Sequence, residues 1–182
     1  MRLLWATLFL ASIRNTYPSS CVCTTVQCPV VGDNMLVMGN GHADMTYNYI
    51  QHGDYVVVSN VKGTITPESL DKGSETTSCT QKYARLLEDD GNQDCDAGHI
   101  LANRLGGYGN EPLNIFPQDA SVNRGVYAQM EGKIYDCMQQ ANQGHLSWKF
   151  SYENSSSTQP FQVEYTAEFD KGCPKMQQLF YN

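Results

Sequence analysis

The chain is poor in basic residues and lacks any long apolar run. Its 182 residues include 12 lysines and arginines against 19 aspartates and glutamates, which gives a net charge of −7. A module that binds nucleic acid tightly needs a basic stripe, and this sequence has none. No segment approaches 18 consecutive apolar residues, so the sequence offers no candidate for a membrane-spanning helix.

The length fits one domain of ordinary size that buries a single sizeable core. Leu3–Ile13 form a short apolar run behind Arg2, and the small residues Ser19 and Ser20 follow. This pattern is typical of a secretory signal peptide. We therefore expect a signal peptide over residues 1–20 and a single secreted, extracellular domain over residues 21–182, without a membrane anchor.

Seven cysteines favour a disulfide framework in a secreted chain. They are Cys21, Cys23, Cys28, Cys79, Cys95, Cys137 and Cys173. Cleavage after Cys21 would leave six, whereas cleavage after Ser20 would leave seven and one unpaired or intermolecular thiol. We expect disulfides at Cys79, Cys95, Cys137 and Cys173. A zinc site in the first three cysteines is the rival interpretation, but it lacks a second C-x-x-C or a histidine pair.

Two short blocks carry the chemistry of the chain. Residues 94–107 read D-C-D-A-G-H-I-L-A-N-R-L-G-G, and residues 114–131 read N-I-F-P-Q-D-A-S-V-N-R-G-V-Y-A-Q-M-E. A histidine takes a proton from water near neutral pH, and a carboxamide with a carboxylate holds a hydrated hard cation against a phosphate. Together these residue types indicate a phosphodiesterase.

The first block resembles the D-x-G-H signature of the DNA/RNA non-specific endonucleases, a ββα-metal family also called His-Me finger nucleases. The second is similar to the family pattern N-x-x-P-Q, L-N-x-G and a terminal glutamate. The resemblance implies an α+β fold, with a mixed antiparallel sheet and a ββα-metal motif at about residues 94–140. It also implies Mg²⁺-dependent hydrolysis of DNA and RNA to 5′-phosphate products, with Mn²⁺ or Ca²⁺ as substitutes.

The resemblance also assigns roles to individual residues. It implies that His99 is the general base and that Asn123 is the metal ligand. Glu131 would hold a water of the metal, and Asn114 would orient His99 or these waters. Gln118 would contact phosphate, while Asp96 would fix the motif loop as a supporting acceptor.

Some of these residues also have simpler interpretations. Asn123 suits the N-cap of a helix, although Asp119 and Ser121 offer earlier caps. Glu131 could be a solvated helix residue, and Asn114 could satisfy a buried backbone group. The remaining histidines, His42, His52 and His145, have no motif around them, and we expect them to be structural.

The sequence departs from the family pattern at Ala97. Many relatives have arginine there, whose guanidinium would help to hold the phosphate. We expect Arg104 or Arg124 to bind substrate in its place. Residues 97–135 contain three basic and three acidic side chains, so the net negative charge of the chain lies outside this window.

Periodicity predicts the elements around the motif. We expect a hairpin with strands Tyr55–Ser59 and Thr64–Thr66 around a turn at Asn60–Gly63. The other predictions are a helical turn at Lys82–Leu87, an acidic loop at Glu88–Asp94, a buried strand at Ile100–Leu101, a second strand at Leu113–Phe116, a helix from Ser121 to about Gln140, and an antiparallel pair of Trp148–Tyr152 with Phe161–Tyr165 at the edge of the core.

Two other functions are compatible with parts of the sequence. A secreted binding protein could retain the nuclease fold without activity, since a fold does not imply a function. A disulfide-rich structural domain would explain the cysteines. Neither explains the ordered set at residues 96, 99, 114, 123 and 131, so nucleic acid as a substrate is the favoured prediction.

Overall fold

The structure is a computed structural model, and it describes Cys23, residues 26–87 and residues 95–182. The predicted signal peptide and the predicted acidic loop at Glu88–Asp94 lie outside the described residues. Within the described part of the chain, no helix has both the length and the apolar character needed to cross a membrane.

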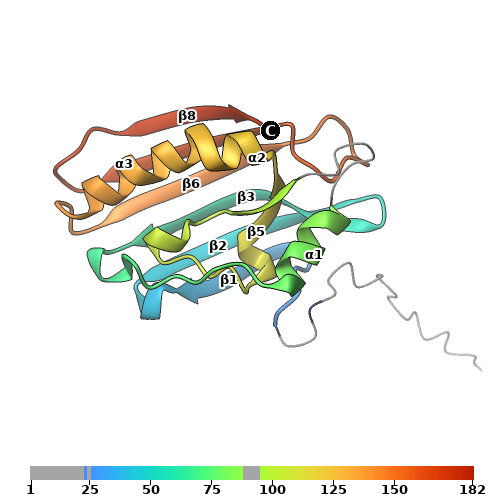
Figure 1. Cartoon of the computed structure of the whole chain (residues 1–182), viewed down its shortest axis with the longest axis horizontal. Coiled ribbons are helices and arrows are strands. Elements are labelled where there is room, and N and C mark those ends of the chain that lie inside the picture. The colour runs from blue at the N-terminus through green and yellow to red at the C-terminus, as the bar shows by residue number, and fades with distance from the viewer. Residues whose placement is uncertain (1–22, 24–25, 88–94) are drawn as a thin grey trace, which may run out of the picture.

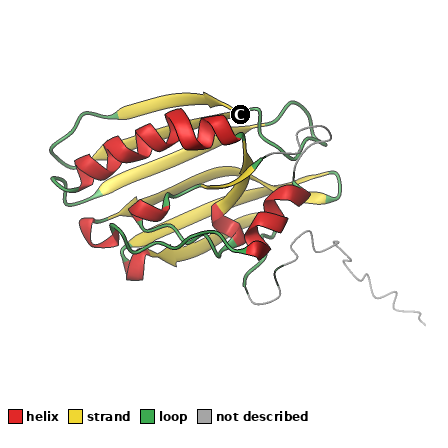
Figure 2. Ribbon diagram, in the orientation of Figure 1, coloured by secondary structure: helices red, strands yellow, loops and turns green. Residues whose placement is uncertain are grey.

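A six-stranded antiparallel sheet forms the body of the molecule (Figure 1), with strand order β1-β2-β3-β6-β7-β8. The strands are β1 Gly32–Met38, β2 Ala43–His52, β3 Tyr55–Ile65, β6 Gly144–Ser151, β7 Gln162–Phe169 and β8 Met176–Tyr181. Helices and loops cover one face of this sheet (Figure 2). The α+β class with an antiparallel sheet is therefore confirmed.

The covered face of the sheet carries the large buried side chains. Burial alternates along β2, β6 and β7, as expected for strands with one face on a core. Trp148 stacks on Tyr165 with ring centroids 4.3 Å apart. These two residues are register partners, so the predicted pairing of Trp148–Tyr152 with Phe161–Tyr165 is confirmed. The pair lies within the sheet, with β3 and β8 on either side of it.

The predicted hairpin within residues 55–66 is wrong. Residues 55–65 form the single strand β3, whose second half pairs with β6. Gly63 is not part of a turn but lies where β2 packs closely against β3. A Cβ at this position would lie 2.3 Å from the Asp44 carbonyl oxygen. The chain turns instead between β2 and β3, where Gly53 has a φ of 54°.

A smaller unit of two strands and a helix lies on the covered face. Strands β4 (Asp96–His99) and β5 (Ile115–Gln118) pair antiparallel, and His99 is the register partner of Ile115. Helix α2 (Ala120–Val122), a π-helical turn (Asn123–Tyr127) and α3 (Ala128–Met138) follow. This is the arrangement of strand, strand and helix expected from the motif.

The two motif strands differ in position from the prediction. Ile100 and Leu101 are buried as expected, but they follow β4 in a bend. Leu113 and Asn114 belong to a 3-10 turn, Pro112–Asn114, and β5 runs through Pro117. Proline is tolerated in this strand because the pair has only two strands, so each is an edge.

The remaining helical segments frame the motif. Helix α1 spans Ser78–Leu86 and is longer than the predicted turn, because Thr77 and Thr80 form a reciprocal cap at its start. Short 3-10 turns occupy Gly39–Gly41, Pro67–Ser69 and Asn103–Leu105.

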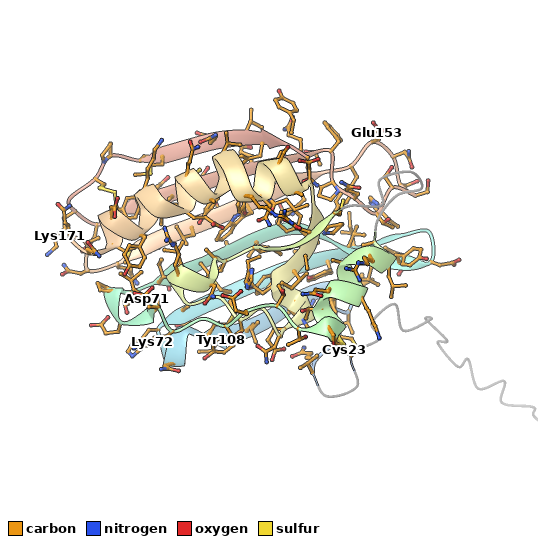
Figure 3. All side chains as sticks on the ribbon, in the orientation of Figure 1. Cys23, Asp71, Lys72, Tyr108, Glu153 and Lys171 are labelled. Carbon is orange, nitrogen blue, oxygen red and sulfur yellow. A yellow bond between two sulfur atoms is a disulfide. The ribbon has the colours of Figure 1, made fainter. Side chains whose placement is uncertain are left out.

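Two disulfides are defined between described residues, so the fold is disulfide-stabilised as predicted. Cys23, below α1 in Figure 3, bonds to Cys79 in α1, and Cys137 bonds to Cys173. Cys28 is also disulfide-bonded, which rules out the zinc interpretation for these cysteines. No disulfide is defined between Cys95 and another described residue, so a disulfide at Cys95 stays a prediction. The motif is held by the β4–β5 ladder.

Candidate active site

His99 is the last residue of β4. One of its ring nitrogens makes a hydrogen bond within the protein, and the other has no partner among the described residues. Its Nε2 lies 3.0 Å from the carbonyl oxygen of Ser74. A carbonyl only accepts hydrogen bonds, so Nε2 carries the proton and the lone pair of the neutral ring is on Nδ1. Burial lowers the pKa of His99, while the bond to Ser74 and the charge of Glu75 oppose this shift. The geometry therefore favours a neutral imidazole with Nδ1 as its base.

The contact from Ser74 could not be predicted from the sequence, because the backbone carbonyl of this residue makes it. Backbone hydrogen bonds fix this residue: its N–H donates to the carbonyl of Gly107 and its carbonyl accepts from the N–H of Gly109, both at 3.0 Å. The glycine-rich loop after β4 thus orients the carbonyl that accepts the hydrogen bond from His99.

Asp96 links β4 to the start of the motif helix. Its Oδ2 accepts from Asn123 Nδ2 at 2.9 Å and from Arg124 Nε at 2.9 Å, and its Oδ1 accepts from Arg124 Nη2 at 2.6 Å. Burial by itself raises the pKa of Asp96, because it disfavours the ionised form. The hydrogen bonds outweigh this effect, so the pKa of Asp96 is lowered. The prediction that Asp96 supports the motif as an acceptor agrees with this geometry.

The bond to Asp96 determines which way the Asn123 amide faces. Because Nδ2 is directed at a carboxylate, Oδ1 is directed away from it. That oxygen accepts no hydrogen bond from the described residues. A carboxamide oxygen held in this way is suited to ligate a hard cation.

His99, Asn123 and Glu131 line one cavity of about 520 Å³, which we call the first cavity. Its lining is Asp71, Glu75, His99, Ala102, Asn103, Arg104, Asn123 and Glu131. Burial raises the pKa of Glu131 to about 8, and the nearby Arg104 opposes this shift. The structure thus brings together the predicted base, the predicted ligand and the predicted glutamate.

A second cavity of about 380 Å³ shares His99, Asn123 and Glu75 with the first. Its other lining residues are Thr76, Gln81, Arg85, Cys95, Asp96, Ala97 and Arg124. The two predicted substrate-binding arginines are thereby separated, with Arg104 in the first cavity and Arg124 in the second. Arg85, which comes from α1, also lines this cavity. It was not predicted from the sequence, because no motif surrounds it.

Arg104 is held at the first cavity by an aromatic platform. Its guanidinium carbon lies 5.4 Å from the centroid of the Tyr135 ring. The Tyr135 hydroxyl in turn donates to Asp71 Oδ2 at 2.6 Å. Asp71, labelled in Figure 3, therefore fixes the ring on which the arginine stacks.

Asn114 does not line either cavity, so the structure does not support a catalytic role for it. The side chain is fully buried. Its Oδ1 accepts from the Tyr47 hydroxyl at 2.9 Å and from the Leu101 N–H at 2.8 Å. Its Nδ2 donates to the carbonyls of Leu101 at 2.9 Å and Tyr108 at 3.3 Å. The simpler interpretation, a residue that satisfies buried backbone groups, describes it better.

Replacement of Asn114 by alanine is expected to destabilise the fold by about 3 kcal/mol or more. The variant would leave several buried polar groups without partners, and each costs about 1–3 kcal/mol. Equilibrium unfolding in urea measures the loss. Asn60→Ala, at an exposed position on β3, is the matched control and should change the free energy of unfolding by less than about 0.5 kcal/mol. Equal stability of the two variants would contradict this assignment.

Gln118 is buried too, so the predicted contact with phosphate is wrong in this structure. Only 1% of the residue is exposed, and neither polar atom of its amide has a partner among the described residues. The side chain packs over Gly98, where an added Cβ would lie 2.3 Å from Gln118 Oε1. This contact explains why the motif needs glycine immediately before His99.

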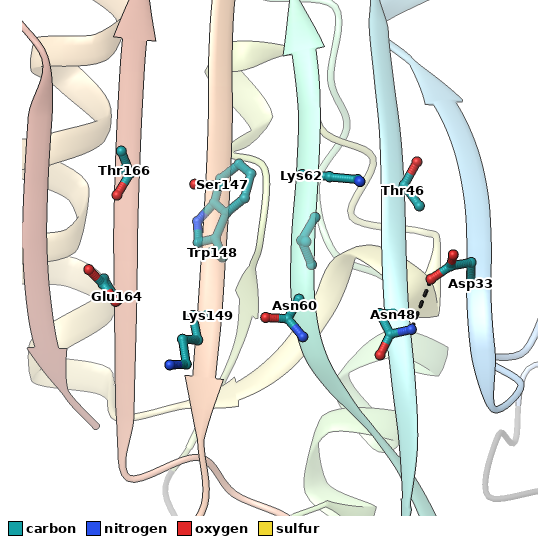
Figure 4. Close-up of a pocket in the computed structure, with 11 residues that line it drawn as sticks. Asp33, Thr46, Asn48, Asn60, Lys62, Ser147, Trp148, Lys149, Glu164 and Thr166 are labelled. Carbon is teal, nitrogen blue, oxygen red and sulfur yellow. Dashed lines mark hydrogen bonds between the residues drawn. The ribbon is translucent and has the colours of Figure 1, made fainter.

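A further hollow lies on the opposite face of the sheet (Figure 4). Its volume is about 410 Å³, and it is lined by polar side chains on five strands, including Asn48 and Asp33, which are hydrogen-bonded at 2.8 Å. It contains no histidine, and none of the predicted site residues lines it. The cavity that contains His99, Asn123 and Glu131 is therefore separate from this hollow.

Comparison with known proteins agrees with this assignment. The family model for DNA/RNA non-specific endonucleases matches residues 40–170. The chain belongs to this family. It is also 35% identical over 133 residues to the probable deoxyribonuclease RhsA of Dickeya dadantii (strain 3937). That match covers 73% of this chain but only 9% of the much longer relative.

Solved structures with a similar fold include NucA from Streptococcus agalactiae. The form with bound magnesium has a TM-score of 0.51 at 12% identity, covering 82% of this chain and 84% of NucA. The form without metal has a TM-score of 0.53 at 13% identity, covering 86% and 83%. At this level of identity the likeness extends to the fold.

Proposed function

We propose that the chain is a secreted, Mg²⁺-dependent endonuclease that hydrolyses phosphodiester bonds of both DNA and RNA and leaves 5′-phosphate ends. One observation carries this proposal: a partly buried imidazole with its lone pair on Nδ1 and an oriented carboxamide line the same cavity. A base beside a cation ligand provides the two functions that metal-assisted hydrolysis of a phosphodiester uses.

The residues of the first cavity fit a largely hydrated divalent cation. Asn123 Oδ1 provides one oxygen ligand, and Glu131 provides a carboxyl group on the same wall. Burial penalises the ionised form of Glu131, so a nearby cation would stabilise its carboxylate. The described residues contain no cluster of three histidine, cysteine, aspartate or glutamate side chains that could enclose a metal. Mg²⁺, which keeps several waters, suits such a sparse site.

His99 would act on the attacking water. Its Nδ1 would take a proton from the water as the water oxygen bonds to phosphorus and the bond between phosphorus and the 3′-oxygen breaks. The 3′-oxygen would leave with a proton from solvent water, and the bond from Nε2 to Ser74 would fix the ring and stabilise the charge that it gains. A bound divalent cation would supply Lewis-acid stabilisation of the charge on the phosphate. Arg104, stacked on Tyr135, is placed to balance charge in the first cavity.

The proposed range of substrates and the proposed location rest on separate arguments. The residues that line the first cavity address the sugar-phosphate backbone, and such contacts carry no sequence information. The relative from Dickeya dadantii is named a probable deoxyribonuclease, which supports DNA as one substrate. The two disulfides favour an oxidising compartment and therefore secretion.

Digestion of plasmid DNA and of RNA, each with Mg²⁺ and with excess chelator, tests the proposal directly. We expect both polymers to be cut inside the chain when Mg²⁺ is present, and the new ends to be substrates for enzymes that require a 5′-phosphate. Absence of cleavage by the oxidised, folded protein in every divalent metal would favour the binding-protein alternative.

A further inference from the structure

The first and second cavities differ in the balance of acidic and basic side chains that line them. The site therefore has two parts of different charge. Three lining residues, His99, Asn123 and Glu75, are common to both. Among the charged residues found in one cavity alone, the first has two acidic side chains and one basic, and the second has two basic and one acidic. They are Asp71, Glu131 and Arg104 in the first, and Arg85, Arg124 and Asp96 in the second.

The arginines of the second cavity retain hydrogen-bonding capacity. Arg124 uses Nε and Nη2 for Asp96, which leaves Nη1 without a partner among the described residues. The side chain of Arg124 is 72% exposed. Arg85 lies in the last turn of α1, is exposed, and forms no ion pair with a described residue. Guanidinium groups that line one cavity and keep unused hydrogen-bond donors are the usual recognition groups for phosphate.

The small side chain of Ala97 belongs to the same cavity. Its position in β4 is two residues before His99, and one residue from Asp96, which holds Arg124. The second cavity therefore begins beside the reacting centre and leads to α1.

We propose that Arg85 and Arg124 form a binding site for the phosphate adjacent to the one that reacts. The ligand is a backbone phosphodiester of the same polynucleotide strand, and the site favours polymers over molecules with a single phosphate. Arg85 provides a guanidinium from α1, while Arg124 provides Nη1 and remains tied to Asp96. This inference rests on the proposed nuclease function, because it names a subsite of the same active site.

The test compares a substrate that has one phosphodiester with one that has several. Thymidine 5′-p-nitrophenyl phosphate provides only the reacting group, whereas a single-stranded oligonucleotide also provides its neighbours. Arg85→Ala should raise KM for the oligonucleotide about tenfold, since a hydrogen bond to a charged group is lost, and should leave kcat unchanged. Its kcat/KM for the small ester should equal that of the wild type.

Lys82→Ala is the matched control, because Lys82 lies on the same helix, is exposed, and does not line the cavity. We expect it to match the wild type on both substrates. An equal loss on the small ester, an unchanged KM for the oligonucleotide, or the same rise in KM for Lys82→Ala would overturn the proposal.

A binding measurement separates failure of this inference from failure of the nuclease proposal. In the His99→Ala background, fluorescence anisotropy gives Kd for a labelled oligonucleotide at several salt concentrations without cleavage. Adding Arg85→Ala should weaken binding about tenfold and reduce the slope of log K against log salt by about 1. An unchanged slope overturns the subsite whether or not the wild type cleaves. A lower slope in a protein that cuts neither substrate would instead retain the subsite and reject the nuclease.

Discussion

Replacement of His99 by alanine is expected to lower kcat by about 10²–10⁴, the usual contribution of a general base. The structure gives the reason, because Nε2 is committed to Ser74 and only Nδ1 is left to receive a proton. Cleavage of an oligonucleotide under single-turnover conditions measures the loss. His145→Ala, at an exposed position on β6, is the matched control and should retain wild-type activity.

The pH profile provides an independent check on the same residue. The ring accepts a proton only when it is neutral, so activity should be present above the pKa of His99 and fall as the pH drops through it. Because burial lowers that pKa, the acid limb should have its midpoint below the reference of about 6.5. An unchanged acid limb in His99→Ala, with near-normal turnover, would remove His99 from the role of base.

The elements that local pattern determines could be predicted from the sequence. The spacing of apolar residues marks the helix that includes α3, and alternation marks β6 and β7. The prediction failed in β3 because a glycine within a strand looks like a turn until its neighbour is known. Gly63 is required by the close approach of Asp44, a contact between two strands that no local window contains.

The same limit applies to the site. His99 and Asn123, the predicted base and the predicted ligand, were recognisable from a short motif, and the structure brings both into one cavity. Asn114 and Gln118 belong to the second motif block, but their environment depends on what packs over β5. Both residues were expected to contact metal or phosphate. In the folded chain the elements packed around them bury both in the core. The burial of a polar residue in a motif must therefore be known before a chemical role is assigned to it.

Loss of the Asn123 carboxamide is expected to have an effect as large as loss of the base. Asn123→Ala removes the side-chain oxygen that the bond from Nδ2 to Asp96 leaves directed away from that carboxylate, at a residue that lines the first cavity. We expect kcat/KM at a fixed Mg²⁺ concentration to fall by about 10²-fold or more, and excess chelator to abolish wild-type activity until Mg²⁺ is restored. Activity measured against Mg²⁺ concentration gives both results, and Mn²⁺ binding followed by electron paramagnetic resonance reports the site without turnover.

Asp96→Asn distinguishes a ligand from the residue that orients it. This variant keeps Asn123 but weakens the acceptor that holds Nδ2, so the carboxamide oxygen loses its fixed direction. Partners that orient a ligand typically contribute about 10–100-fold to metal affinity. Asp96→Asn should therefore need more Mg²⁺ and recover most of its activity when the cation is abundant, whereas Asn123→Ala should not recover. Full cleavage in excess chelator, or a normal Mg²⁺ requirement in Asn123→Ala, would show that the cation is not held here and that the chemistry relies on His99 and the arginines.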